Sequence, residues 1–207
     1  MKYKEYEPKY FEKPKHSEFS PVKRILVNII SATPILSLYY HNIVKIIKTM
    51  PKNGKVLDIG CSHGGFLNFV HNIRPDLRLY GTDISNVQKL LPPFVKFIKK
   101  DIINDNIGEK EFDFVHSRHL IEHLAVSDVN TYFKKCRNLL KKKGICFVLC
   151  PRISKEFFND PTHIRPYNKE SLSRFFSMAS FSDIKAYDGY EYNLPIGMKL
   201  AFGFARK

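Results

Sequence analysis

The chain has 207 residues, of which 43% are hydrophobic, and it carries a formal net charge of +14. This composition excludes an intrinsically disordered chain, and the length suits one domain with a full core better than two. The positive charge attracts polyanions, anionic membrane surfaces or acidic substrates, and lysines spread along the whole chain are equally typical of an ordinary solvated surface. Nucleic acid therefore stays open as a partner on charge alone.

Residues 1–24 form a basic segment in which lysines alternate with tyrosines and phenylalanines. Such a segment can grip single-stranded nucleic acid by charge and stacking, or fold as an arm over a substrate pocket, and we favour the arm. Its charges and prolines are unlike a secretory signal peptide. Residues 25–50 are apolar and largely helical in pattern, with too many polar interruptions for a transmembrane span. We expect helices that cover a sheet there, with peripheral membrane contact as the alternative.

The four cysteines have neither the density of a disulfide scaffold nor a C-x-x-C spacing. One lies in the glycine-rich segment described next, and two lie in an apolar run near residue 148. This usage suits a reducing compartment, so we expect a cytoplasmic protein.

Residues 55–66 are the segment around which the rest of the chain is organised. Val56, Leu57 and Ile59 make the short apolar run of a buried parallel strand. The glycines that follow allow a sharp turn and a close approach of a ligand, and from Phe66 the apolar pattern becomes helical. Strand, glycine loop and helix in this order predict the ligand-binding turn of a doubly wound α/β sheet.

Further strands and helices alternate after this turn, which predicts a parallel sheet with right-handed crossovers. The strands each end near a polar or acidic residue, where such folds bind their ligands. The expected strands are 78–83, 95–98, 112–115 and 144–150, the expected helices are 126–140 and 171–179, and segments 184–192 and 198–205 read as a closing hairpin. A polar loop at 151–168 separates the fifth strand from the last helix, and long loops of this kind are usually functional.

These motifs, in this order and spacing, resemble the class I S-adenosylmethionine-dependent methyltransferases, and within them the small-molecule "type 11" branch. The resemblance covers roughly residues 50–207. The matching segments are V-L-D-I-G-C at 56–61, the acids Asp83 and Asp101, F-D-F-V at 112–115, L-I-E-H-L at 120–124, L-K-K-K-G at 140–144 and H-I-R-P-Y at 163–167. The resemblance implies a Rossmann-like, seven-stranded, mostly parallel sheet in the order 3-2-1-4-5-7-6, with strand seven antiparallel, helices on both faces and an N-terminal helical cover.

It also implies a division of the chain. Residues 1–24 would be the basic aromatic arm, and 25–207 a single methyltransferase domain. Within that domain, 25–50 would be the cover helices, 51–150 the cofactor-binding half, and 151–207 the substrate loop and closing hairpin.

The implied cofactor is S-adenosylmethionine, with S-adenosylhomocysteine as the product. By resemblance, the loop backbone and Asp58 hold the methionine portion, Asp83 holds the ribose hydroxyls, and Asp101 accepts the adenine amino group. The full implied set is Asp58, Gly60, Cys61, Ser62, Gly64, Asp83, Ile84, Asp101, Ile102 and Ser117. Ser62 departs from the family's second glycine, and a serine can fit there if its backbone angles are ordinary.

Methyl transfer to an activated sulfonium mostly requires positioning, and a general base is needed only if the acceptor must lose a proton. Candidate bases are His116, His119, His123 and His163, of which we expect His119 and His163 to be catalytic. His119 and His123 would share a face if their segment is helical. Substrate contacts are expected from His163, Arg165 and Tyr167. A metal site built from His119, His123 and His163 would lack a supporting acid or cysteine pattern, so none is expected.

The sequence therefore predicts an enzyme that transfers a methyl group to an oxygen or nitrogen atom of a small-molecule, sugar or lipid-linked acceptor. Two alternatives stay open at this point. One is a nucleic-acid methyltransferase, which the positive charge favours, and the other is a non-catalytic binding protein with the methyltransferase fold. The oligomeric state is not predicted.

Overall fold

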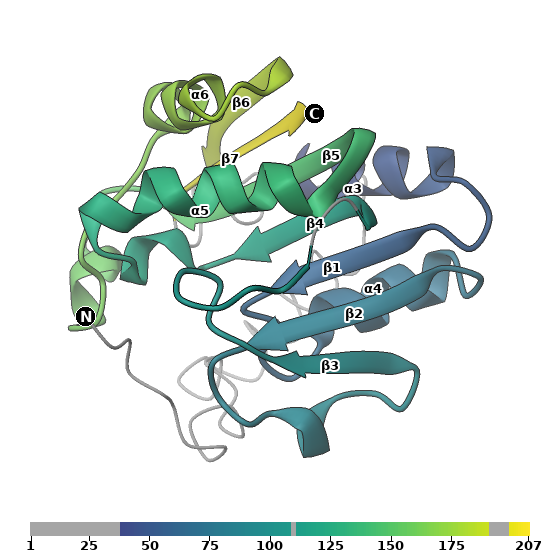
Figure 1. The fold of residues 1–207 in the computed structure, drawn as a ribbon. Coiled ribbons are helices and arrows are strands. Elements are labelled where there is room, and N and C mark those ends of the chain that lie inside the picture. The colour runs from purple at the N-terminus through teal and green to yellow at the C-terminus, as the bar shows by residue number, and fades with distance from the viewer. Residues whose placement is uncertain (1–37, 109–110, 191–198) are drawn as a thin grey trace, which may run out of the picture.

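The computed structural model describes residues 38–108, 111–190 and 199–207. The expectations for the arm at 1–24 and for the first part of the cover helices lie outside these residues. The described chain forms one seven-stranded sheet in the order β3-β2-β1-β4-β5-β7-β6, flanked by helices (Figure 1). The predicted fold class and strand order are confirmed.

The elements follow the predicted alternation. The strands are β1 Lys55–Ile59, β2 Arg78–Asp83, β3 Val95–Lys99, β4 Phe112–Arg118, β5 Leu140–Pro151, β6 Ser182–Tyr190 and β7 Lys199–Arg206. The α-helices are α3 Leu38–Thr49, α4 Gly65–Ile73, α5 Val126–Leu139 and α6 Lys169–Met178. The described residues also include the short 3-10 turns η2 Gln88–Leu90, η3 Ile121–His123 and η4 Glu156–Asn159.

The directions of the strands show at which edge of the sheet the candidate site lies. Strands β3, β2, β1, β4 and β5 run parallel to one another, and β7 is antiparallel to both β5 and β6. The carboxyl ends of the parallel strands therefore meet at one edge of the sheet, which Figure 1 shows as the side toward which their arrows point. Parallel sheets with this topology bind their ligands at that edge.

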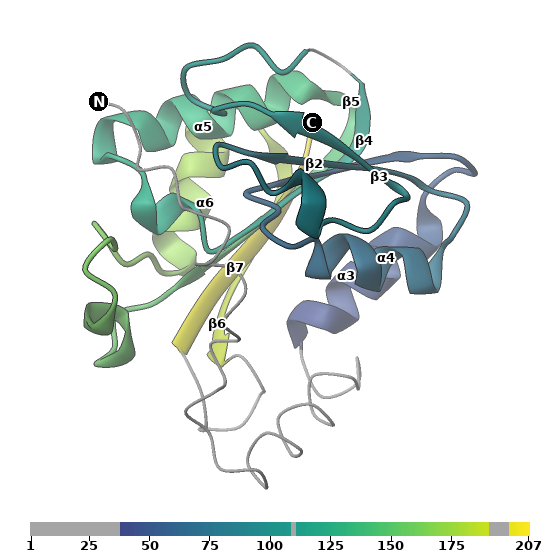
Figure 2. The ribbon, with the colours of Figure 1, turned by 90° about the horizontal axis from the view of Figure 1, so that it is seen from below.

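Helices α3 and α4 cover one face of the sheet, and α5 and α6 cover the other (Figure 2). Under α3 and α4, the ring of Phe147 stacks on Phe202 and Phe204, with centroids 5.7 and 5.4 Å apart, and meets Tyr39 edge-on. Aromatic residues of β5, β7 and α3 thus form a single packed layer, which fixes α3 against the centre of the sheet.

The face under α5 and α6 is built from a second aromatic group. Phe133 of α5 packs edge-on against Phe176 of α6, at 4.8 Å between ring centroids, and Phe176 meets Phe181 in the same way. Phe176 is fully buried and Phe175 is partly buried against the same core. This cluster holds the last helix against the closing hairpin of β6 and β7.

Two strand boundaries differ from the prediction. Strand β5 begins at Leu140 instead of Gly144, because Leu140 already pairs with Phe112 of β4, ahead of a register shift, and Lys143 and Gly144 bond the backbone of Lys207. Strand β4 continues to Arg118 beside β5, so residues 116–118 are extended. Apolar periodicity marks only the buried part of a strand, so it does not detect polar residues at either end.

The four cysteines are free and buried, as their sequence context indicates. Burial raises the pKa of the thiols of Cys61, Cys146 and Cys150. Buried thiols of this kind are inert packing groups.

In the described part of the chain, we find no helix with the length and apolar character that a membrane crossing needs.

We predict that Phe147→Ala lowers the free energy of unfolding by about 3–5 kcal/mol, because it removes a fully buried ring and leaves a cavity in the aromatic layer. The control is Phe158→Ala, since Phe158 is 68% exposed and its loss should change stability by about 0.5 kcal/mol or less. Urea denaturation of the two variants measures both. A Phe147→Ala variant as stable as the control would show that this layer does not carry the fold.

Candidate active site

The loop after β1 is a backbone cradle that leads directly into α4. Gly60 and Gly64 adopt left-handed conformations, with φ of 73° and 78°. The N–H groups of Gly60 and Cys61 both donate to the Thr82 carbonyl, at 2.8 and 3.1 Å, which fastens the loop to the end of β2. A Cβ at position 64 would lie 2.8 Å from Leu91, so only glycine fits there.

The same loop requires a glycine on the neighbouring strand. A Cβ at position 81 would lie 2.7 Å from the sulfur of Cys61. The absence of a side chain at Gly81 therefore leaves room for the buried side chain of Cys61. This side chain packs against β2, on the side of the loop that faces away from a ligand. Of the predicted cofactor residues, Cys61 can contribute only its backbone.

Ser62 adopts a left-handed conformation with φ of 49°, so its backbone angles are not ordinary and the serine occupies this position in another way. A non-glycine residue in this region carries a cost of about 1–2 kcal/mol. Two contacts hold it there: its N–H donates to Asp83 Oδ2 at 3.1 Å, and its hydroxyl lies 3.2 Å from His63 Nδ1. The position has a left-handed conformation that favours glycine, although the residue is a serine.

Asp83 ends β2 and faces this loop. Its carboxylate accepts the Ser62 N–H on one oxygen and the Ser85 N–H on the other, at 3.1 and 2.9 Å. Burial raises the pKa of the Asp83 carboxyl group, and the two backbone donors act against that rise. A carboxylate oxygen has two acceptor positions, so Asp83 is fixed in place while it keeps positions for further donors.

Asp101 follows β3 and caps its own turn. Its Oδ1 accepts the N–H of Ile103 at 2.7 Å, and its Oδ2 accepts the side-chain amide of Asn104 at 2.7 Å. The neighbouring Ile102 is buried in the core on the α5 side of the sheet. Ile84, beside Asp83, is partly exposed. The structure places these three residues at the strand ends where the sequence expects them, and their contacts with adenine stay a prediction.

Asp58 lies beneath the loop and is the acid of a buried hydrogen-bond chain. His116 is its register partner on β4, and His116 Nδ1 lies 2.7 Å from Asp58 Oδ1. The other ring nitrogen of His116 lies 2.7 Å from the hydroxyl of Tyr39 on α3. Burial raises the pKa of the Tyr39 phenol, so it keeps its proton and can donate it to His116, whose other ring nitrogen can then donate to Asp58.

The ring of His116 also stacks on Phe66, the second residue of α4, with centroids 3.6 Å apart. His116 is fully buried and both its nitrogens are engaged, so this candidate base cannot meet an acceptor from solvent. Sequence reasoning missed Tyr39 and this chain of bonds. The signal that could have found it is strand parity, which puts residues 58 and 116 on the same face of adjacent strands.

Ser117 and His119 end β4. The Ser117 hydroxyl bonds the Tyr132 hydroxyl on the α5 face, so its side chain is buried away from the loop and only its backbone can serve a cofactor. His119 has φ of 53°, donates its N–H to the Leu149 carbonyl, and places Nδ1 3.2 Å from Glu122 Oε1. The sequence predicts that His119 and His123 share a face if their segment is helical. Because β4 runs to Arg118 and a 3-10 turn follows, the segment is not an α-helix and the two histidines do not share such a face.

The long loop at 152–168 returns to this same edge of the sheet. The backbone N–H groups of Ile164 and Arg165 both point to the Glu122 carbonyl, at 2.7 and 3.4 Å, which joins the loop to η3. The rings of His123 and His163 lie 4.9 Å apart, and burial lowers the pKa of His123.

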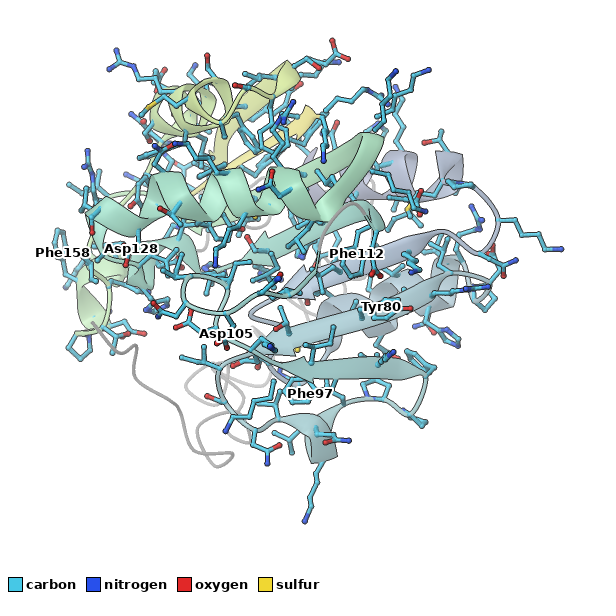
Figure 3. The ribbon with its side chains drawn as sticks, in the orientation of Figure 1. Tyr80, Phe97, Asp105, Phe112, Asp128 and Phe158 are labelled. Atoms are coloured by element: carbon cyan, nitrogen blue, oxygen red, sulfur yellow. The ribbon has the colours of Figure 1, made fainter. Side chains whose placement is uncertain are left out.

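In Figure 3, Asp105 after β3, Asp128 in α5 and Phe158 in η4 all lie on the side of the strands' carboxyl ends.

The three predicted substrate residues differ in exposure. Arg165 is exposed, with its guanidinium 5.9 Å from the centre of the Tyr167 ring. His163 is nearly buried in its side chain, and its Nδ1 donates to the Phe157 carbonyl at 2.8 Å. Tyr167 is 2% exposed and packs in the core against Phe175, so its ring forms the buried surface beside which the Arg165 guanidinium lies.

The strand ends thus bring together three groups that are far apart in the sequence. The glycine loop and Asp83 form one side, and His119 with Glu122 follows β4. His123 and the loop around His163 form the other side. The predicted roles of these side chains in cofactor and substrate binding stay predictions.

A family model for the methyltransferase domain matches residues 36–186, which is more than half of the chain. Among curated proteins, the phosphoethanolamine N-methyltransferase of Plasmodium falciparum is 30% identical over 142 residues, covering 64% of this chain and 52% of that protein. The chain spans about half the length, or less, of the curated relatives it matches.

Solved structures share the fold. A SAM-dependent methyltransferase from Archaeoglobus fulgidus superimposes with a TM-score of 0.66 at 19% identity, over 89% of this chain and 99% of that one. Phosphoethanolamine N-methyltransferase 2 of Haemonchus contortus, solved with S-adenosyl-L-methionine, gives a TM-score of 0.65 at 17% identity, over 81% of this chain and 51% of that one. Together with the strand order and the glycine loop, the family match shows that this chain belongs to the methyltransferase domain family and has the class I fold its motifs predict.

Proposed function

We propose that this protein is an S-adenosylmethionine-dependent methyltransferase that transfers a methyl group to an oxygen or nitrogen atom of a small-molecule acceptor. The observation that carries the proposal is the left-handed loop after β1, bound through the Ser62 N–H to the Asp83 carboxylate of β2. This arrangement unites a backbone cradle with an acid placed to accept ribose hydroxyl hydrogens.

The residues of the site suit each part of the cofactor. Helix α4 begins at the loop with Gly64 as its N-cap and no side-chain cap, so its first N–H groups can receive the methionine carboxylate. Asp83 would take the ribose hydroxyls and Asp101 the adenine amino group. Asp58, which is hydrogen-bonded to His116, would support the loop at the end of β1. Its remaining acceptor positions, or a water, would bind the ammonium group.

The acceptor would enter from the side of His119, His163 and Arg165. The sulfonium of the cofactor already activates the methyl group, so the protein's task is to align the acceptor atom with the carbon–sulfur bond and exclude water. The acceptor atom forms a bond to the methyl carbon as the carbon–sulfur bond breaks, and the electron pair stays on sulfur. An alcohol or ammonium acceptor must also lose a proton, for which the candidate is His119, a partly exposed histidine just after β4.

The relatives support a small acceptor. The matched Plasmodium protein is named for phosphoethanolamine, and another matched relative, from Pelagibacter ubique, is named as a ubiquinone biosynthesis O-methyltransferase. The exposed Arg165 guanidinium suits an anionic group such as a phosphate or carboxylate on the acceptor. Sugar and lipid-linked acceptors with such groups belong to the same class.

Calorimetric titration with S-adenosylmethionine and S-adenosylhomocysteine at two salt concentrations tests the cofactor. We expect saturable one-to-one binding of both, with little dependence on salt. Methyl transfer from labelled cofactor to phosphoethanolamine, hydroxylated aromatic acids and RNA then tests the acceptor class. Absence of binding would refute the enzyme, and transfer to RNA alone would refute the small-molecule acceptor.

We predict that Ser62→Gly keeps or tightens S-adenosylmethionine binding and raises the free energy of unfolding by up to about 1 kcal/mol, because glycine relieves the left-handed strain at a small entropic cost. The matched control is Ser180→Gly, since Ser180 has a similar φ of 62° and follows α6, outside the site. The control should gain stability without changing affinity. A tenfold loss of affinity in Ser62→Gly would show that the serine has a binding role of its own.

We predict that Asp83→Asn weakens S-adenosylmethionine binding about tenfold or more, because a charge-assisted acceptor of the ribose hydroxyls is lost while the shape is kept. Asp183→Asn is the control, because Asp183 is an exposed acid on the edge strand β6. Calorimetry compares both variants with the natural protein. Equal affinities would exclude Asp83 as the ribose acceptor.

The raised pKa of Asp83 adds a pH dependence to this prediction. The deprotonated form is the one that accepts both hydroxyl hydrogens, so affinity should fall on acidification, and the fall should begin at a higher pH than an exposed aspartate would give. Asp83→Asn should remove this dependence. Binding measured along a pH series provides the check, and an unchanged pH profile in the variant would assign the titration to another group.

A further inference from the structure

Three side chains from two distant segments of the sequence meet beside the acceptor end of the sheet. Glu122 and His123 belong to η3, and His163 comes from the long loop. One potential ligand atom from each of the three lies within 4.8 Å of the other two. Glu122 is fully buried. The three histidines considered from the sequence lacked a supporting acid, and the fold provides one in Glu122 in place of His119.

Hydrogen bonds from Nδ1 to neighbouring residues fix the orientation of the His123 and His163 rings. His163 Nδ1 donates to the Phe157 carbonyl at 2.8 Å. His123 Nδ1 lies 3.0 Å from the Thr162 hydroxyl, and that hydroxyl donates its own proton to Asp160. The Thr162 oxygen therefore accepts from His123 Nδ1. Both rings carry their proton on Nδ1, which leaves Nε2 of each ring as the nitrogen with a lone pair.

This is the pattern that metal-binding histidines show in proteins. A ligating imidazole almost always donates its other N–H to a carbonyl, a carboxylate or a similar acceptor, which fixes the tautomer and the ring plane. Here two rings have that support, and a buried carboxylate completes the group. A second acid, Asp160, lies 3.8 Å from His163 Nε2.

The backbone holds the group together without help from a ligand. Ile164 N–H donates to the Glu122 carbonyl at 2.7 Å, so the segment after His163 is bonded to the residue before His123. The Thr162–His123 contact joins the same two segments on the other side. The cluster is therefore preformed, with one potential ligand atom of each side chain within 4.8 Å of the other two, and imidazole nitrogens gathered around a buried carboxylate favour a cation among them.

We propose that Glu122, His123 and His163 bind a divalent transition-metal ion. Two imidazole nitrogens and one carboxylate oxygen suit zinc and its neighbours, cobalt or manganese, better than magnesium or calcium, which prefer oxygen ligands alone. Metal–ligand bonds of about 2.0–2.2 Å bring ligand atoms to about 3.5 Å from one another, so separations of up to 4.8 Å would shorten by about 1.3 Å at most on binding. Three protein ligands leave a coordination position open for water or an acceptor oxygen.

The consequence for catalysis rests on the proposed function. Glu122 also bonds His119, which ends β4, so the ion would lie next to the acceptor's entry side. There it would hold an anionic or hydroxyl group of the acceptor and lower the pKa of a bound hydroxyl. Metal binding itself is a separate property, and it can be measured without cofactor or acceptor.

Cobalt binding to the chelator-treated, dialysed full-length protein tests the site. We expect one equivalent of Co²⁺ to give saturable visible absorption and one equivalent of Zn²⁺ to abolish it by displacement. His123→Ala and His163→Ala should each weaken binding by about a hundredfold or more, since even the loss of an outer-shell partner costs about 10–100-fold. Glu122→Gln, which keeps the shape of the side chain, should weaken binding in the same direction. His71→Ala is the control, because His71 lies on α4 and stacks on Phe94.

Absence of saturable Co²⁺ and Zn²⁺ binding in the natural protein would overturn the proposal, whatever the variants do. Binding that survives unchanged in His123→Ala and His163→Ala would overturn it as well, by placing the ion elsewhere. Circular dichroism of each variant shows whether it is folded. Titration with S-adenosylmethionine in parallel separates this proposal from the proposed function, because failure of cofactor binding leaves the metal result intact.

Discussion

The buried carboxyl group of Asp58 is the constraint on which the candidate site depends. A polar group in the core costs free energy unless it is hydrogen-bonded, and here the partners come from two other elements. His116 on β4 bonds Asp58 directly, and Tyr39 on α3 bonds His116. One chain of bonds therefore joins the cover helix, the central strand pair and the start of the glycine loop. The loop's geometry depends on α3 as well as on β1, although α3 contributes no residue to the predicted cofactor set.

Most of the fold could be predicted because its signals are local. Apolar runs ended by glycine or acid mark β1 and β2, and the order of motifs fixes the topology through resemblance. The errors lie where the signal is not local. Strand β5 starts early because Leu140 pairs with Phe112 of β4, and β4 continues through His116 because β5 lies beside it. No pattern within those segments records a partner that comes from elsewhere in the chain.

The site follows the same rule. Asp83 and the loop glycines were predictable, since their position in a strand–loop–helix unit determines their task. The backbone strain at Ser62 could not be predicted, because the residue type alone does not show that a serine adopts a positive φ. The meeting of Glu122 with His163 was equally hidden, because it depends on how a long loop folds back over η3. Long loops position side chains through hydrogen bonds that periodicity cannot reveal.

The buried cysteines give the molecule internal reporters of its own motions. A thiol with a raised pKa and no access to solvent reacts with an alkylating reagent only when the structure around it opens. Cys61 lies in the loop after β1, whereas Cys136, Cys146 and Cys150 lie in the core under α5 and α6. Modification of Cys61 would thus follow the breathing of the cofactor loop, and modification of the other three would follow opening of the sheet itself. The natural sequence can therefore distinguish local from global unfolding without an added label.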